Sequence, residues 1–185
     1  MSNIPNLLTL FRIFSIPLLV ILFYIPGDTI RWLMLLLYII ACITDYLDGY
    51  LARSWHQVSA LGKFLDPIAD KLLIATLILM LTATNIIENW TVIPALVILC
   101  REILVSGLRE FLANTQVTMP VSTLAKWKTL AQMISLGFLI IQNITPAFLH
   151  VNLIGQIGLW IAAIFTIITG YDYLKAGLKY IKANG

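Results

Sequence analysis

Long apolar runs occupy most of this 185-residue chain, and they limit it to folds in which each segment pairs its own backbone polar groups. Hydrophobic residues make up 60% of the sequence and charged residues only 11%, a composition that a soluble domain of this size would not tolerate. A helix needs about 20 apolar residues to cross the hydrocarbon core of a bilayer. We therefore predict an all-α, polytopic membrane protein in which residues 1–185 form a single membrane-embedded domain.

Turn-forming residues divide the apolar runs into six predicted transmembrane helices. These spans cover about residues 7–24, 30–53, 64–84, 91–113, 122–143 and 152–182. In this arrangement Pro67 falls in the first turn of the third span, where a helix accepts proline. The chain leaves little room for any further domain.

The basic residues predict the orientation of these six spans. If both termini lie on one side of the membrane, that side or its adjacent helix ends receives Arg12, Arg53, Lys63, Lys71, Arg101, Arg109, Lys126, Lys128, Lys175, Lys179 and Lys182. The opposite side keeps only Arg31. Because cytoplasmic loops carry an excess of Lys and Arg, we predict that both termini are cytoplasmic.

Four of the nine acidic residues lie where the second predicted span leads into the third. Asp45 and Asp48 share one helix face, and Asp66 and Asp70 share another, because residues three or four apart are neighbours on a helix. If the two segments form an antiparallel hairpin, the four carboxylates converge on one pocket. Their mutual repulsion would then need neutralising, and all-oxygen ligands suit hard cations such as Mg²⁺, Mn²⁺ or Ca²⁺. The sequence predicts a site for one or two divalent ions; the alternative is that the aspartates only join helices.

These acidic residues belong to a longer pattern with fixed spacing, D-x2-D-G-x2-A-R-x8-G-x3-D-x3-D. Its positions are occupied by Asp45, Asp48, Gly49, Ala52, Arg53, Gly62, Asp66 and Asp70. The pattern resembles the signature of the CDP-alcohol phosphatidyltransferase family, whose members displace CMP from a CDP-linked lipid with an alcohol. The resemblance implies that Asp45, Asp48 and Asp66 bind Mg²⁺ or Mn²⁺. It implies that Asp70 is a further metal ligand or the catalytic base that takes the proton of the alcohol.

The same resemblance implies a binding pocket for the CDP-lipid. Gly49 and Ala52 would leave clearance for the cytidine nucleotide, and Arg53 would contact a phosphate. The other residues that the resemblance places in this pocket are Pro5, Asn6, Thr9, Ser59 and Gly62. For Thr9 the alternative is a hydrogen bond to the backbone of its own helix.

Four cations near the ends of the fourth and fifth predicted spans bear on the acceptor alcohol: Arg101, Arg109, Lys126 and Lys128. Arg101 and Arg109 are eight residues apart, so they project from about the same helix face. Cations within membrane helices mark a functional partner or a paired carboxylate. The alternatives are pairing with Glu102, Glu110 or the aspartates, and snorkelling of the lysines to the interface. Taken together, the four cations predict a pocket for the phosphate of an anionic acceptor, which a neutral alcohol would not require.

A wider resemblance, to the bacterial phosphatidylglycerophosphate synthases, covers nearly the whole chain. It rests on residues 3–12, 101–102, 108–110 and 126–132. It implies transfer from CDP-diacylglycerol to sn-glycerol 3-phosphate by a homodimer in the bacterial plasma membrane, with the active site facing the cytoplasm. Within the family, phosphatidylglycerol or an inositol phosphate are alternative acceptors, as in a cardiolipin synthase or an inositol-phosphate transferase. From another class, a small ion-coupled transporter would show internal repeats, and none is visible in the sequence.

Overall fold

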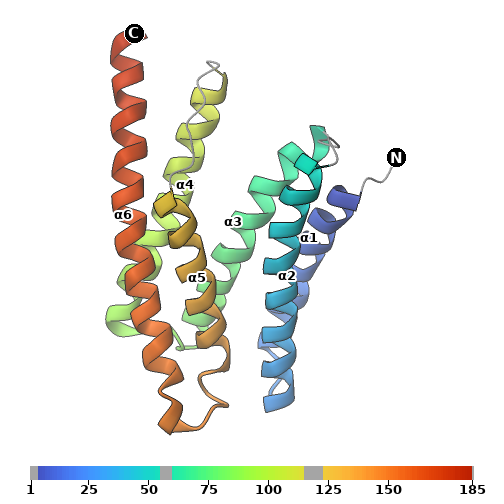
Figure 1. Cartoon of the computed structure of the whole chain (residues 1–185). Helices are drawn as coiled ribbons and strands as arrows, with labels where there is room; N and C mark the ends of the chain where they lie inside the picture. Colours follow the sequence, from blue (N-terminus) through green and yellow to red (C-terminus); the bar gives the residue numbers. More distant parts are fainter. Residues whose placement is uncertain (1–3, 55–59, 115–122, 185) are drawn as a thin grey trace. The chain divides into compact units, whose positions relative to one another are not determined.

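The computed structural model describes residues 4–54, 60–114 and 123–184, which form α-helices joined by short turns and contain no strand (Figure 1). The prediction of an all-α fold is therefore confirmed for the described residues. The contacts within the chain divide it into two units. The first unit comprises Met1–Ile86 and Leu136–Asn152, and the second comprises Ile87–Ser135 and Leu153–Gly185.

Each predicted span corresponds to one α-helix. The helices are α1 (Ile4–Phe23), α2 (Asp28–Ser54), α3 (Ala60–Ala83), α4 (Val92–Asn114), α5 (Thr123–Ile141) and α6 (Val151–Asn184). Two short 3-10 helices, η1 (Asn89–Thr91) and η2 (Ala147–Leu149), precede α4 and α6. The observed ends lie within four residues of the predicted ones, and differences of one or two residues are within the uncertainty of any helix boundary.

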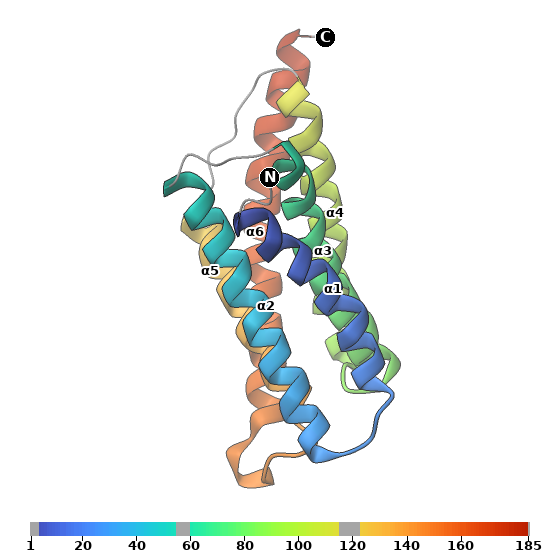
Figure 2. The ribbon, with the colours of Figure 1, turned by 90° about the vertical axis from the view of Figure 1, so that its right-hand side faces the viewer.

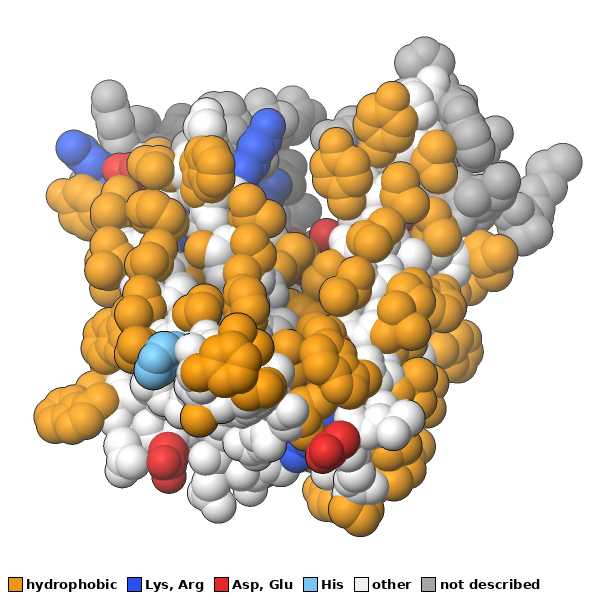
Figure 3. Space-filling view, turned by 60° about the horizontal axis from the view of Figure 1, so that its bottom comes forward, with side chains coloured by type: hydrophobic (Ala, Val, Ile, Leu, Met, Phe, Trp, Pro, Cys, Tyr) orange, Lys and Arg blue, Asp and Glu red, His pale blue; other side chains and the backbone are white. Residues whose placement is uncertain are grey.

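Five of the helices, α1, α2, α4, α5 and α6, are long and apolar enough to cross a membrane. The helix α3 is not among them, because Asp66, Asp70 and Lys71 interrupt its apolar sequence. Large hydrophobic side chains such as Phe14, Ile21 and Leu36 are exposed, and hydrophobic side chains cover much of the face drawn in Figure 3. This apolar exterior suits a helical protein that is surrounded by lipid.

In the first unit, α1 and α2 run antiparallel and are joined by a turn at residues 24–27 (Figure 2). Gly27 in this turn has a φ of 129°, a backbone conformation that glycine adopts at little cost. The closest helix packing among the described residues of this unit is that of α1 against α2 and against α3. The helix α1 therefore packs against both helices that carry the acidic segments, α2 and α3.

One expectation about α3 was wrong. The helix begins at Ala60, four residues before the predicted start, so that Pro67 lies inside the helix and not in its first turn. Ala60 and Leu61 are good helix formers, which lets the helix begin well before the proline. Proline has no N–H, so the carbonyl of Lys63 receives no helical hydrogen bond from residue 67.

In the second unit, small residues of α6 allow close packing against α4 and the first part of α5. A Cβ atom built on Gly177 would lie 2.7 Å from Leu108 Cδ1 on α4. A Cβ atom on Gly158 would lie 3.2 Å from Ser135 Cβ on α5, and Ser135 donates a hydrogen bond to the carbonyl of Gly155. Small residues at helix contacts are typical of membrane helix bundles, because they let the backbones approach closely.

Candidate active site

The acidic cluster of the first unit is centred on Arg12 of α1. Arg12 Nη1 lies 2.6 Å from Asp45 Oδ1, and Arg12 Nη2 forms an ion pair with Asp48 Oδ2. Both aspartates come from α2, one helical turn apart. The side chain of Arg12 has no exposed surface, and Asp48 is only 2% exposed. A buried guanidinium thus ties α1 to the two signature aspartates of α2.

Thr9, one turn before Arg12, lies between one of these carboxylates, Asp48, and a carboxylate of α3. Its Oγ1 donates a hydrogen bond to Asp66 Oδ1 at 2.6 Å and lies 3.4 Å from Asp48 Oδ2. Thr9 is buried, so these contacts are shielded from solvent. The resemblance placed Thr9 in the CDP-lipid pocket, and the structure places it directly among the signature aspartates.

The structure brings three of the four aspartates together. Asp45 and Asp48 both approach the guanidinium of Arg12, and Asp48 and Asp66 both approach the hydroxyl of Thr9. Asp70 lies one turn further along α3, which corresponds to a rise of about 6 Å. Asp70 therefore lies beside the group of three carboxylates.

The donor chemistry of this cluster fits a hard divalent ion. The donors are carboxylate oxygens, the ligands that Mg²⁺ and Mn²⁺ prefer. With all groups ionised, three carboxylates and one guanidinium leave a net charge of −2, which one divalent ion would neutralise. Among the described residues, no three Asp, Glu, His or Cys side chains are arranged around one point as an ion's ligand set. The carboxylates are instead grouped around Arg12 and Thr9, and the metal site stays a prediction.

Some residues predicted for the CDP-lipid pocket can be placed and others cannot. Asn6 is half-buried on α1, one turn before Thr9, and Gly49 is half-buried on α2, directly after Asp48. Gly62 is half-buried near the start of α3. The side chains of Pro5, Ala52 and Arg53, and the whole of Ser59, lie outside the described residues. The proposed contacts of these residues with nucleotide stay predictions.

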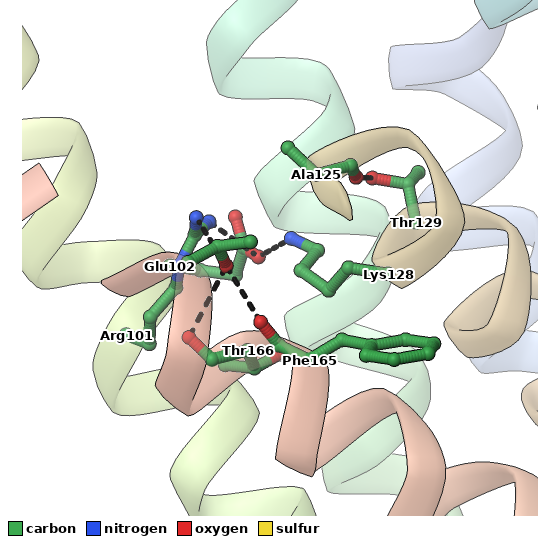
Figure 4. A network of polar contacts seen from close by, with 8 residues as sticks. Arg101, Glu102, Ala125, Lys128, Thr129, Phe165 and Thr166 are labelled. Carbon is green, nitrogen blue, oxygen red and sulfur yellow. Dashed lines mark hydrogen bonds and ion pairs between the residues drawn. The ribbon is translucent and has the colours of Figure 1, made fainter. Parts of the chain in front are cut away.

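The second unit contains a polar cluster built on Glu102 of α4 (Figure 4). Glu102 Oε1 forms an ion pair with Lys128 of α5 and lies 3.4 Å from Arg101 Nη1. Arg101 Nη2 donates a hydrogen bond to Thr169 Oγ1 of α6 at 3.1 Å, and its guanidinium carbon lies 5.6 Å from the ring centre of Tyr173. Arg101 therefore joins α4 to α6 by a hydrogen bond and a cation–π contact.

These contacts divide the four cations predicted for the acceptor phosphate into two pairs. Arg101 is half-buried and Lys128 is buried, and the alternative of pairing with Glu102 is confirmed for both. Arg109 on α4 and Lys126 on α5 are exposed. The structure thus gathers two of the four cations at one carboxylate, and the acceptor pocket as a whole stays a prediction.

Arg12 and Glu102 were not among the predicted site residues. Arg12 could have been found, because it is the one charged residue in the first predicted span. A single cation in an apolar helix has to meet an anion, and the signature supplies four of the nine acidic residues of the chain. Glu102 appeared only as an alternative partner, since its position gives no sign of which cation it meets.

A model of the CDP-alcohol phosphatidyltransferase family matches residues 2–168 of this chain. The chain belongs to that family. Several relatives that carry the name CDP-diacylglycerol--glycerol-3-phosphate 3-phosphatidyltransferase are similar to it over nearly the full length. The protein of that name from Rickettsia bellii is 51% identical over 179 residues, which cover 97% of each chain. The one from Haemophilus influenzae is 42% identical over 176 residues, covering 94% of this chain and 92% of the relative.

A relative of the same name from Pseudomonas fluorescens is 39% identical over 186 residues and is covered to 94% of its length. The resemblance to the CDP-alcohol phosphatidyltransferases that the signature indicated is therefore confirmed. Because the family match includes all of α1 to α5, it takes in the acidic cluster and the contacts of Glu102 with Arg101 and Lys128. Membership of a phosphatidyltransferase family sets the ion-coupled transporter aside.

Proposed function

We propose that this protein transfers the phosphatidyl group of CDP-diacylglycerol to sn-glycerol 3-phosphate, giving phosphatidylglycerophosphate and CMP. One observation carries the proposal. Relatives named for this reaction are 49–51% identical to the chain over 97% of its length. The signature aspartates and the four cations of α4 and α5 give the proposal a chemical basis.

The reaction needs charge neutralisation, a base and a fixed geometry at the phosphorus. In the proposed reaction the hydroxyl of the acceptor attacks the β-phosphorus of CDP-diacylglycerol, and CMP leaves. Asp45, Asp48 and Asp66 would hold Mg²⁺ or Mn²⁺, whose charge neutralises the diphosphate when bound. Asp70, beside this group on α3, would accept the proton of the attacking hydroxyl or complete the ligand set.

The helix α1 would fix the positions of the proposed metal-binding carboxylates of α2 and α3 relative to one another. Thr9 bonds Asp66 of α3 and approaches Asp48 of α2, so the carboxylates of two helices keep a fixed separation. Burial of Thr9 and Asp48 excludes water from this side of the cluster. A preorganised, dry arrangement of charges stabilises a transition state better than mobile side chains do.

The choice of sn-glycerol 3-phosphate is supported by the charges of the second unit. Arg109 and Lys126 are exposed and could bind a phosphate directly, with Arg101 and Lys128 adding positive charge nearby in sequence. Glycerol 3-phosphate carries the anionic group that such cations recognise. Inositol, choline or serine would not need them.

We further propose that all six helices span the bacterial plasma membrane, with both termini and the active site on the cytoplasmic side. The positive-inside distribution of Lys and Arg supports this orientation. As a sixth span, α3 would place its aspartates toward the protein interior, where ionisable residues of membrane helices are found. A homodimer is expected from the family.

An activity assay of purified protein with different acceptor alcohols tests the function. Protein in detergent micelles is supplied with CDP-diacylglycerol and Mg²⁺ or Mn²⁺, and CMP release and lipid product are measured. We expect phosphatidylglycerophosphate with sn-glycerol 3-phosphate and loss of activity on chelation that is restored by either ion. Product only with phosphatidylglycerol, or only with an inositol phosphate, would contradict the proposed acceptor. Full activity in chelator would contradict the metal requirement while leaving the acceptor intact.

A further inference from the structure

Arg12 is a fully buried cation whose neighbours in the described structure are the metal-binding candidates themselves. Its two terminal nitrogens each approach a different carboxylate, Asp45 and Asp48. A buried charge is tolerated in a membrane helix only when an opposite charge neutralises it, because the hydrocarbon cannot solvate it. The pairing therefore stabilises Arg12 and Asp48, both of which are buried.

The guanidinium is held mainly by charge and not by a full set of hydrogen bonds. Its Nε has no hydrogen-bond partner among the described residues, and the close approach of Nη1 to Asp45 lacks hydrogen-bond geometry. An arginine that fixes a carboxylate permanently would use its planar fork in a bidentate pair. Here the fork is divided between two carboxylates, an arrangement that a competing cation can displace.

We infer that Arg12 is the internal counter-ion of Asp45 and Asp48 and that it competes with divalent ions for these two carboxylates. The inference rests on the metal site of the proposed function and adds a residue that controls it. Asp45 Oδ1 and Asp48 Oδ2 cannot give their full charge both to the guanidinium and to an ion. Arg12 thus offsets part of the negative charge of the acidic cluster without metal and lowers the affinity with which metal binds.

The test is a direct Mn²⁺ titration of purified protein, with free Mn²⁺ followed by its electron paramagnetic resonance signal and no lipid substrate added. Arg12→Gln removes the competing charge, so we expect Mn²⁺ to bind about tenfold more tightly than to the unaltered chain, which corresponds to the interaction of a single nearby charge. Arg12→Lys keeps a positive charge and is expected to bind Mn²⁺ with nearly the original affinity.

Arg31→Gln is the matched control, because Arg31 belongs to the same unit and stacks on Phe23, 5.4 Å from its ring centre. We expect this variant to bind Mn²⁺ as the unaltered chain does. Thermal unfolding in chelator provides a second readout. Arg12→Gln should unfold at a lower temperature than the unaltered chain, and saturating Mn²⁺ should raise its unfolding temperature by more.

If Arg12→Gln is too unstable without metal, it can be purified with Mn²⁺ bound. Chelator is then added to Arg12→Gln and to Arg12→Lys, and the chelator concentrations that remove half of the bound Mn²⁺ are compared. Unchanged or weaker Mn²⁺ binding by Arg12→Gln overturns the inference, because Arg12 would then only position the carboxylates. Absence of Mn²⁺ binding by the unaltered chain overturns it as well. A chain that binds Mn²⁺ as expected but makes no phosphatidylglycerophosphate contradicts the proposed function and leaves the role of Arg12 standing.

Discussion

Lys128 of α5 donates a charge-assisted hydrogen bond to Glu102 of α4, 26 residues earlier in the chain. Lys128 is only 5% exposed, so the carboxylate of Glu102 supplies much of its stabilisation. The contact joins two helices of the second unit and shares Glu102 with Arg101. Two cations predicted to meet the acceptor phosphate are therefore already partly neutralised within the protein.

This pairing predicts strong coupling between Lys128 and Glu102. Lys128→Met should lower the free energy of unfolding by roughly 2 kcal/mol, because among the described residues Glu102 then keeps only the more distant Arg101 as a cationic partner. Glu102→Gln should lower the free energy of unfolding by a similar amount. The double variant should lose less free energy of unfolding than the two single variants lose together, with a coupling energy of roughly 1–3 kcal/mol. Denaturant unfolding in mixed micelles measures these values, with Lys175→Met as an exposed control. Strict additivity would show that the contact contributes nothing.

The proposed acceptor pocket predicts that Arg109 contributes to binding of the acceptor. Arg109→Ala should raise KM for sn-glycerol 3-phosphate by roughly tenfold or more and change kcat less, because a charge-assisted hydrogen bond to phosphate contributes roughly 1.5–3 kcal/mol. Lys128→Ala should act in the same direction. Lys175→Ala, which removes an exposed cation of α6 in the same unit, serves as control. If KM stays unchanged in both variants, the acceptor pocket lies elsewhere.

If Asp70 is the base, its substitution should lower turnover more than it weakens the binding of metal and CDP-lipid. Asp70→Asn should reduce kcat by about 10²-fold or more, since it removes the proposed base for the acceptor proton. Binding of Mn²⁺ and of CDP-diacylglycerol should remain substantial, because Asp45, Asp48 and Asp66 are intact. Equilibrium binding of both ligands is measured beside activity, and Asp172→Asn on α6 is the control. Equal losses of binding and turnover would make Asp70 a metal ligand only.

Two glycines of the second unit predict opposite effects of the same substitution. Gly177→Ala places a Cβ 2.7 Å from Leu108 Cδ1, so we expect overpacking to lower the free energy of unfolding by roughly 1–3 kcal/mol. Gly107→Ala meets no atom within 4 Å and should stabilise α4 by roughly 0.5–1 kcal/mol through helix propensity. Unfolding of both variants in detergent measures the difference. A stable Gly177→Ala variant would mean that Leu108 moves aside freely.

Much of the fold follows from local features of the sequence. The apolar runs and the turn residues predicted six helices whose ends lie within four residues of the observed ones. The signature spacing correctly indicated the family and predicted that Asp45 and Asp48 share a face of one helix. Local patterns succeed here because helix periodicity and turn formation involve residues that are close in sequence. The start of α3 was missed, because good helix formers outweighed the signal from Pro67.

The amino-acid sequence by itself therefore determined the helices, the family and the residue types of the acidic cluster. Only the tertiary structure decided that Arg12 pairs with Asp45 and Asp48, that Thr9 bridges Asp48 and Asp66, and that Glu102 takes Lys128 as its partner. The physical reason is that an ion pair between helices depends on which faces pack together. Contacts between distant parts of the chain determine which faces pack together, and the spacing of residues within one helix does not.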